Sequence, residues 1–175
     1  MKIGFKKITD IAGLSSIWNL YCSAFPLNER RDLGSLQMLI GNNECEINKI
    51  TIHSEQTAGL CIFWTFHEFL FLEHFAVEPE LRGLGIGEQT LLLLREECPL
   101  ILLETEPPVD EIAARRIKFY QRNGFKLLHR QYFQPSYGGN KPPVEMKLMS
   151  NSVDFTAEEL DKYISTIRKK VYRVQ

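Results

Sequence analysis

The sequence has little of several features that mark specialised proteins. It contains no run of about eighteen apolar residues, which a membrane-spanning helix needs. Its four cysteines form no CxxC pair and no histidine stands at zinc-finger spacing, so we expect no metal site. With 21 basic and 22 acidic residues, the chain also lacks the charge excess that attracts nucleic acid or an anionic membrane. We therefore expect neither as a partner.

What the chain does contain fits an ordinary globular protein. The 175 residues are 44% hydrophobic and 25% charged, enough for one continuous core. Residues 1–7 predict a strand and lack the apolar stretch of a signal peptide, which makes the cytoplasm the expected location. The four scattered cysteines are then expected to be reduced and mostly buried. A catalytic thiol is disfavoured, because no paired base stands near any of them.

Hydrophobic periodicity and turn residues predict the order of the elements. The pattern indicates a strand, two helices, three hairpin-linked strands, a helix, a strand, a helix and two further strands. The single strands are expected at 2–8 and 100–105, and the three hairpin-linked strands at 45–53, 57–66 and 69–77. The first two helices are expected at 10–25 and 29–40, and the later two at 88–95 and 110–123. The last two strands are expected at 125–133 and 144–149.

This order predicts an α/β (α+β) fold, with a mixed, mostly antiparallel twisted sheet of about seven strands flanked by helices. We divide the chain into a domain at residues 1–150 and a C-terminal helical extension at residues 151–175. The extension opens on the capping-box pattern of Thr156 and Glu159 and then carries one apolar stripe. That stripe must be buried on the same domain or on a second subunit, which leaves a homodimer open.

A glycine-rich segment joins the third hairpin strand to the next helix. It reads Arg82-Gly83-Leu84-Gly85-Ile86-Gly87. A helix start offers unpaired N–H groups and the positive end of the helix dipole, and glycines let a phosphate come close to them. A P-loop needs Gly-Lys-Ser/Thr here and a Rossmann fingerprint needs GxGxxG, so neither fits. The alternative is a turn that only connects strand to helix.

This segment resembles motif A of the GNAT superfamily of N-acetyltransferases, Gln/Arg-x-x-Gly-x-Gly/Ala, with Arg82, Gly85 and Gly87 at its fixed positions. Residues 119–125 are similar to the family's second signature, Tyr-x-x-x-Gly-Phe, and the element order matches the family core over about residues 2–149. The resemblance implies a GNAT-type fold with acetyl-CoA as co-substrate. It implies that the pyrophosphate rests on the amides of residues 82–87. The pantetheine arm would then follow the central strand at Phe75, Ala76 and Val77.

The resemblance also implies direct transfer of the acetyl group to an amine, with Tyr120 protonating the departing thiolate. A core aromatic is the alternative for Tyr120. An amine with a pKa near 10.4 must lose a proton before it attacks, so a base helps. The candidates are Glu73, Glu104 and Glu106. His74 is less favoured, and strand alternation predicts that it and Glu73 point to opposite faces. Glu73 itself lies either in a cleft or on a wet sheet face.

The family pattern has one departure here, on the helix that carries the second signature. Many members have Asn seven residues before the tyrosine and Ala four before it, where this chain has Ala113 and Arg116. Arg116 could contact the cofactor phosphates instead, and a solvated helix face is the alternative.

The acceptor pocket is implied at the connection between the first two helices and at the last hairpin. Its candidate substrate-binding residues are Glu29, Arg30, Tyr132 and Tyr137. We expect acetyl transfer from acetyl-CoA to a primary amine of a small molecule. The alternatives are a protein or peptide N-acetyltransferase and a non-catalytic acyl-CoA-binding module. No residue in the sequence identifies the acceptor.

Overall fold

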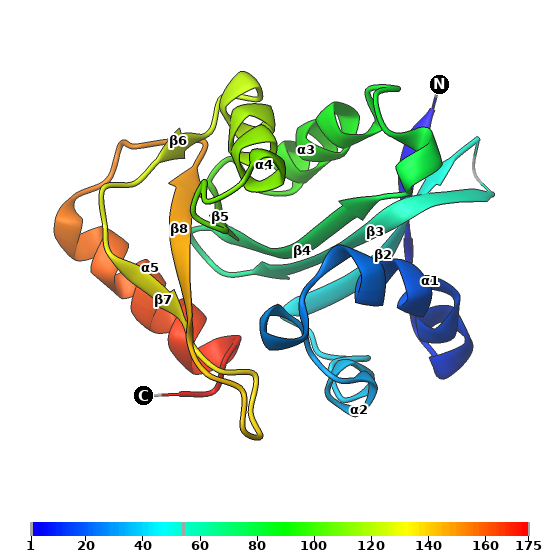
Figure 1. The fold of residues 1–175 in the computed structure, drawn as a ribbon, viewed down its shortest axis with the longest axis horizontal. Coiled ribbons are helices and arrows are strands. Elements are labelled where there is room, and N and C mark those ends of the chain that lie inside the picture. The colour runs from blue at the N-terminus through cyan, green and yellow to red at the C-terminus, as the bar shows by residue number, and fades with distance from the viewer. Residues whose placement is uncertain (1, 54, 175) are drawn as a thin grey trace.

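The computed structural model describes residues 2–53 and 55–174. One sheet of eight strands runs through the molecule in the order β1-β2-β3-β4-β5-β8-β6, and β7 pairs with β8 (Figure 1). The strands are β1 (Ile3–Lys7), β2 (Cys45–Ile52), β3 (Gln56–Thr65), β4 (Leu70–Val77), β5 (Ile101–Thr105), β6 (Lys126–Leu127), β7 (Tyr132–Gln134) and β8 (Val144–Ser150). The helices are α1 (Ile11–Ala24), α2 (Leu33–Gln37), α3 (Ile86–Glu97), α4 (Glu111–Arg122) and α5 (Ala157–Lys170), with 3-10 turns η1 (Leu27–Glu29) and η2 (Pro79–Leu81).

The sheet is mixed and mostly antiparallel, as the sequence predicted. Among the strands of the described residues, only β4 and β5 are parallel, because α3 crosses between them. Their pairing covers just three residues of each strand, Leu70–Leu72 against Ile101–Leu103. Beyond this point no described residue continues the ladder along that edge of β4. The two strands therefore separate, and the sheet has a gap at its centre.

Helices cover both faces of the sheet (Figure 1). We call the side packed by α1, α2 and α5 the α1 face and the side packed by α3 and α4 the α3 face. Each face has its own core, with Leu14, Tyr21 and Ile167 in the first and Leu91 and Ile117 in the second. No helix within residues 2–53 and 55–174 is both long and apolar enough to cross a membrane.

A β-bulge in β4 changes which side chains reach which face. The register of β4 against β3 shifts between Leu72 and His74, which leaves Glu73 as an extra residue. Before the bulge Leu72 belongs to the core of the α3 face, and after it Ala76 belongs to the core of the α1 face. Alternation is therefore reversed along the strand. Glu73 and His74 both lie on the α1 face, so the expectation of opposite faces was wrong.

Two further expectations on the elements differ from the structure. The helix predicted at 29–40 is only η1 followed by the short α2, which begins after Asp32, whose side chain accepts from the backbone of Ser35. The strand predicted at 125–133 is divided into β6 and β7. The backbone N–H of Leu128 still donates to the Leu148 carbonyl, but Tyr132 already pairs with Met146. Four steps along this segment thus correspond to only two steps along β8, so the segment bulges outward. This division gives eight strands in place of about seven.

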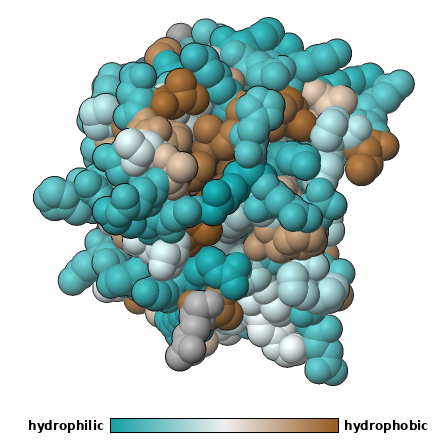
Figure 2. Space-filling view, turned by 90° about the vertical axis from the view of Figure 1, so that its left-hand side faces the viewer, coloured by the Kyte–Doolittle hydropathy of each residue, from teal (hydrophilic) through white to brown (hydrophobic). Residues whose placement is uncertain are grey.

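The C-terminal helix α5 is capped as predicted, with Thr156 and Glu159 forming a capping box. Its stripe of Leu160, Tyr163 and Ile167 is buried in the core of the α1 face of the same chain. Figure 2 shows the side of the molecule that carries α5, where the surface is mainly hydrophilic with separate hydrophobic patches. A second subunit is therefore not needed to cover the stripe.

Candidate active site

A cavity occupies the gap between β4 and β5 and reaches both faces of the sheet. All four predicted catalytic residues line it, namely Glu73, Glu104, Glu106 and Tyr120. The lining also includes Phe75 and Arg116 of the predicted cofactor residues and Glu29 of the predicted acceptor residues. Residues from the first helical connection, from β4, β5 and α4 and from the last hairpin thus meet at one place.

The glycine-rich loop between β4 and α3 has an open helix start. Gly83 and Gly85 have φ of 81° and 78°, the left-handed region that favours glycine. Gly85 is the N-cap of α3 and provides no side-chain cap, and the first backbone bond that closes onto it comes from the N–H of Gln89. The N–H groups of the first turn are therefore left for a ligand.

Gly87 has a different reason to be glycine. An added Cβ would lie 2.9 Å from the Phe119 ring, so the residue lets α3 pack closely against α4. Ile86 is buried in the core and offers only its backbone to the loop, whereas Leu84 is 56% exposed. Two of the three glycines in this loop thus serve the turn, and the third serves the packing of the helix.

The free edge of β4 presents backbone groups toward the gap. Glu78 donates its N–H to Ala58 on the β3 side, and Ala76 pairs with Leu60 on the same side. Because an antiparallel ladder alternates, Phe75 and Val77 direct their backbone groups the other way, where β5 has moved off. The Arg82 side chain already donates to the Val77 carbonyl at 3.1 Å.

Tyr120 lies on α4 with its ring packed between Phe119 and Phe125. Its hydroxyl forms no hydrogen bond with another described residue, and the residue lines the cavity. Burial raises the pKa of Tyr120 above its ordinary value, and the nearby Arg116 charge only partly opposes this. The group therefore remains a protonated phenol near neutral pH, able to donate a proton.

The side chain of Glu73 is fully buried, so it lies on no wet face. The Arg31 guanidinium pairs with it at 2.8 Å, Tyr137 donates to the same oxygen at 2.9 Å, and the Trp64 indole donates to the other oxygen. Burial alone would raise the pKa of Glu73, but the Arg31 charge and these donors hold it below its ordinary value. Its acceptor capacity is largely used, which makes it a poor base.

Glu104 lies near Glu73, is largely shielded from solvent and is held only by neutral donors. Tyr132 donates to one oxygen, while Tyr172 at 2.7 Å and Gln134 at 3.1 Å donate to the other. Burial raises the pKa of Glu104 to about 7, although these three hydrogen bonds act to lower it. A carboxyl group that titrates near neutral pH can hold or exchange a proton there.

The mouth of the cavity carries a second pair of carboxylates. Glu106 forms an ion pair with Arg116, so Arg116 lies at the cavity and not on a purely solvated helix face. Burial, together with the charge of Glu106, raises the pKa of Glu29 to about 7. The neighbouring Arg115 instead pairs with Glu111 on the exposed side of α4.

His74 is held in one tautomer by its surroundings. Its Nε2 lies 3.0 Å from the carbonyl oxygen of Glu29, which can only accept, so the proton belongs on Nε2. The lone pair is then on Nδ1, which has no hydrogen bond in the described part of the chain. Burial lowers the pKa of His74, so the ring is neutral.

The structure adds residues that the sequence did not single out and separates others from the cavity. Arg31 and Tyr172 join the network around Glu73 and Glu104, and Arg31 also donates to the Val171 carbonyl at 2.8 Å. Arg30, predicted to bind the acceptor, donates instead to carbonyls at the end of α1. Tyr132 and Tyr137 reach the site through the carboxylates that they hold and do not line the cavity themselves.

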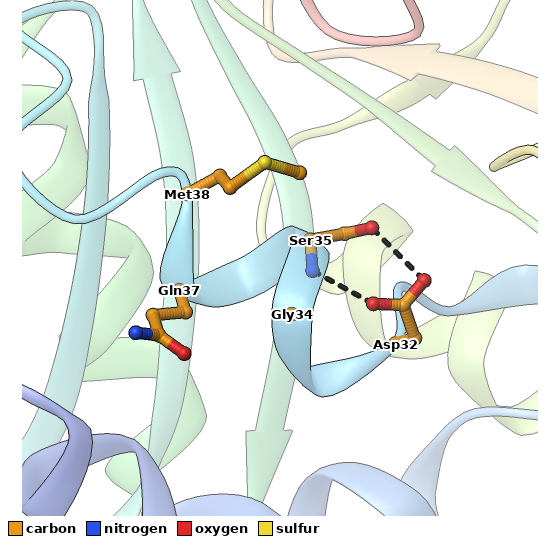
Figure 3. Close-up of a pocket in the computed structure, with 5 residues that line it drawn as sticks. All are labelled: Asp32, Gly34, Ser35, Gln37 and Met38. Atoms are coloured by element: carbon orange, nitrogen blue, oxygen red, sulfur yellow. Dashed lines mark hydrogen bonds between the residues drawn. The ribbon is translucent and has the colours of Figure 1, made fainter.

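A second hollow lies on the surface of α2 and carries no comparable chemistry. Figure 3 shows Asp32 accepting from the backbone and the hydroxyl of Ser35, which is ordinary helix capping. Its other lining residues are Gly34, Gln37 and Met38, all of the same short segment. The residues able to do chemistry therefore gather at the cavity between β4 and β5.

Residues 44–127 match the family model described as the acetyltransferase (GNAT) domain. A solved structure from Bacteroides thetaiotaomicron, provisionally named as a GNAT-family acetyltransferase, is 32% identical over 100% of both chains, with a TM-score of 0.86. The chain belongs to the GNAT family of acetyltransferases.

Two further relatives match this GNAT chain over a shorter stretch or at lower identity. YjbC of Bacillus subtilis (strain 168), provisionally named as an acetyltransferase, is 31% identical over 58% of this chain and 52% of its own length. The match thus spans about half of that curated relative. Spermidine N-acetyltransferase from Vibrio cholerae, solved with CoA and spermine, is 13% identical over 85% of this chain and 94% of that chain, with a TM-score of 0.61. That likeness shows the fold alone.

Proposed function

We propose that this GNAT protein transfers the acetyl group of acetyl-CoA to a primary amine of a small molecule. The observation that carries the proposal is the cavity through the sheet. It joins Tyr120 on the α3 face to the carboxylates on the α1 face at the point where β4 and β5 separate. A thioester and an amine could meet in this gap from opposite faces of the sheet.

The residues present fit acetyl-CoA. The open start of α3 offers N–H groups and a helix dipole to the pyrophosphate, and the free backbone groups of Phe75 and the N–H of Val77 offer partners to the pantetheine amides. Acetyl-CoA supplies the activated acyl group as a thioester. Arg82 is exposed beside this loop and adds a positive charge.

The chemistry that we assign needs two proton movements. The neutral amine nitrogen attacks the carbonyl carbon, the carbon–sulfur bond breaks, and the departing thiolate takes the proton of the Tyr120 hydroxyl. The amine loses its own proton to Glu104, directly or through water, since Glu104 titrates near neutral pH and Glu73 is kept ionised by Arg31. Return of this proton through water to the Tyr120 oxygen restores both groups for the next turnover. Glu106 instead positions Arg116 at the mouth.

A small acceptor is favoured over a protein because aromatic side chains and the C-terminal segment form a wall on the α1 side of the cavity. Tyr132, Tyr137 and Tyr172 are linked to the two buried carboxylates, and the C-terminal segment packs over them. The Vibrio cholerae enzyme of the same fold is named for a small amine, although fold alone does not transfer a substrate. A protein or peptide acceptor would need this wall to move.

The test combines binding and turnover. Calorimetric titration should show acetyl-CoA binding, and a panel of small amines should release CoA thiol, whereas lysine-containing peptides should not. Binding without thiol release from any amine would favour the acyl-CoA-binding module, and release with peptides alone would favour a protein acetyltransferase.

A further inference from the structure

We infer that the α1 side of the cavity is a cation site, and that its ligand is an aliphatic ammonium carrying no carboxylate or phosphate. The inference rests on the proposed acetyl transfer and specifies the substrate class of that same site. It follows from the charges that line the cavity and from buried polar atoms that lack partners.

The charges of the cavity are unequal in number. Its titratable acidic lining consists of Glu29, Glu73, Glu104 and Glu106, and its only cationic lining residue in the described chain is Arg116. Arg116 is engaged by Glu106, and Arg31 behind the wall is engaged by Glu73. No guanidinium is therefore left to receive a carboxylate or phosphate on the substrate, while two carboxylates have no ion-pair partner within the described residues.

Glu104 is the deeper of these two groups. Its oxygens accept hydrogen bonds from Tyr132, Tyr172 and Gln134, all of them neutral donors. A buried carboxylate held only by neutral groups still lacks a counter-charge, and burying it in this state is costly. An ammonium group placed beside Glu104 supplies that charge. Glu29, half-buried at the mouth, adds a second attraction for a cation.

Two buried atoms indicate the same ligand independently of the charges. Gln134 is 3% exposed and gives its amide nitrogen to Glu104 and Tyr172, but its Oε1 has no partner in the described chain. His74 is 2% exposed, and its Nδ1 makes no hydrogen bond in the described chain, although it lies 3.7 Å from a Glu73 carboxylate oxygen. Both residues line the cavity.

The groups on the α1 side that lack a hydrogen-bond partner or a counter-charge are thus all acceptors. Glu104, the Gln134 carbonyl and the His74 ring nitrogen are acceptors, and a primary ammonium brings three N–H donors and no acceptor. A substrate carboxylate would bring only further acceptors into a site that already has too many. The site therefore selects an aliphatic amine, which is cationic at neutral pH, and rejects an amino acid of similar size.

The test is a calorimetric titration of the full chain, saturated with CoA, near neutral pH. The probes are butylamine, γ-aminobutyrate and n-butanol, which share a four-carbon chain and differ in charge. We expect butylamine to bind at least about tenfold more tightly than the other two, which corresponds to about 1.4 kcal/mol. The Glu104→Gln variant should lose at least about tenfold of the butylamine affinity. Glu111→Gln, on the exposed side of α4, should lose none.

Any one of three results would overturn the cation site. These are equal binding of butylamine and γ-aminobutyrate, no binding of butylamine at about 10 mM, and full butylamine affinity in folded Glu104→Gln. The probe comparison uses the unaltered protein, so it decides even where Glu104→Gln does not fold. The titration involves no turnover. Amine binding without acetyl transfer would therefore count against the proposed function and leave the cation site standing.

Discussion

At the scale of single residues, the Tyr120 hydroxyl has no structural task within the described chain. Tyr120→Phe keeps the ring between Phe119 and Phe125 and removes only the proposed acid. Because general acid catalysis is typically worth about 10²–10⁴-fold, we expect kcat to fall by that factor, with the acetyl-CoA dissociation constant nearly unchanged. Steady-state kinetics and calorimetry measure the two quantities. Tyr163→Phe on α5, which does not line the cavity, is the matched control. Equal kcat for the variant and the unaltered protein would remove Tyr120 from the mechanism.

Glu104 should make the stability of the protein depend on pH. Its pKa is about 7 in the folded state against an ordinary value of 4.5, so between these values the folded state binds more protons than the unfolded state. Stability from this group therefore falls as pH rises from about 5 to 8, by roughly 2 kcal/mol. Urea unfolding of the unaltered protein relative to Glu104→Gln, at both pH values, measures this difference. A difference that stays constant with pH would show that burial does not shift this group.

The sequence predicted part of this residue-level picture. The motif match and the carboxylates near a strand end placed Tyr120, Glu104 and Glu106 at one cavity. Arg31 and Tyr172 were missed, because they lie outside any motif and act through contacts between segments that are 42 and 68 residues apart in the chain. No local sequence pattern predicts a contact between segments so far apart in the chain.

At the scale of elements, the loop before α3 can be tested at a position free of backbone strain. Gly85 is a poor choice, since its φ of 78° would penalise any side chain. Leu84 is exposed in the same loop, so Leu84→Glu should place a carboxylate near the phosphates and weaken acetyl-CoA binding about tenfold or more. The Leu92→Glu control puts the same charge on the outside of α3, where Leu92 is 50% exposed, and should bind normally. Equal affinity of the two variants would place the phosphates elsewhere.

The elements themselves were largely predictable, and the two exceptions among the strands share one cause. Periodicity identified the three hairpin strands, the helix after the glycine loop and the capped C-terminal helix. It missed the bulge at Glu73 and the outward turn between β6 and β7, because a bulge changes the pairing of a strand without changing its composition. Both errors fall beside the site.

At the scale of the whole molecule, α5 should contribute to the stability of the main domain. Ile167 is 0% exposed in the core of the α1 face, so Ile167→Ala should lower the free energy of unfolding by about 2–5 kcal/mol. The exposed Lys169→Ala on the same helix should change it by less than about 0.5 kcal/mol. Denaturant unfolding measures both, and a single transition is expected because α5 shares its core with α1. Unchanged stability of Ile167→Ala would mean that α5 folds apart from the domain.

The extra residue in β4 has a consequence for how this strand can change over evolutionary time. Deletion of Glu73 would join Leu72 directly to His74, and their partners Phe63 and Ile62 are already neighbours in β3. The ladder would close without the bulge, and Phe75, Ala76 and Val77 would keep the faces that they have now. What the deletion removes is the acceptor of Arg31, Trp64 and Tyr137, which would leave a buried guanidinium without its counter-charge. Descendants that lose the inserted position should therefore also have replaced Arg31.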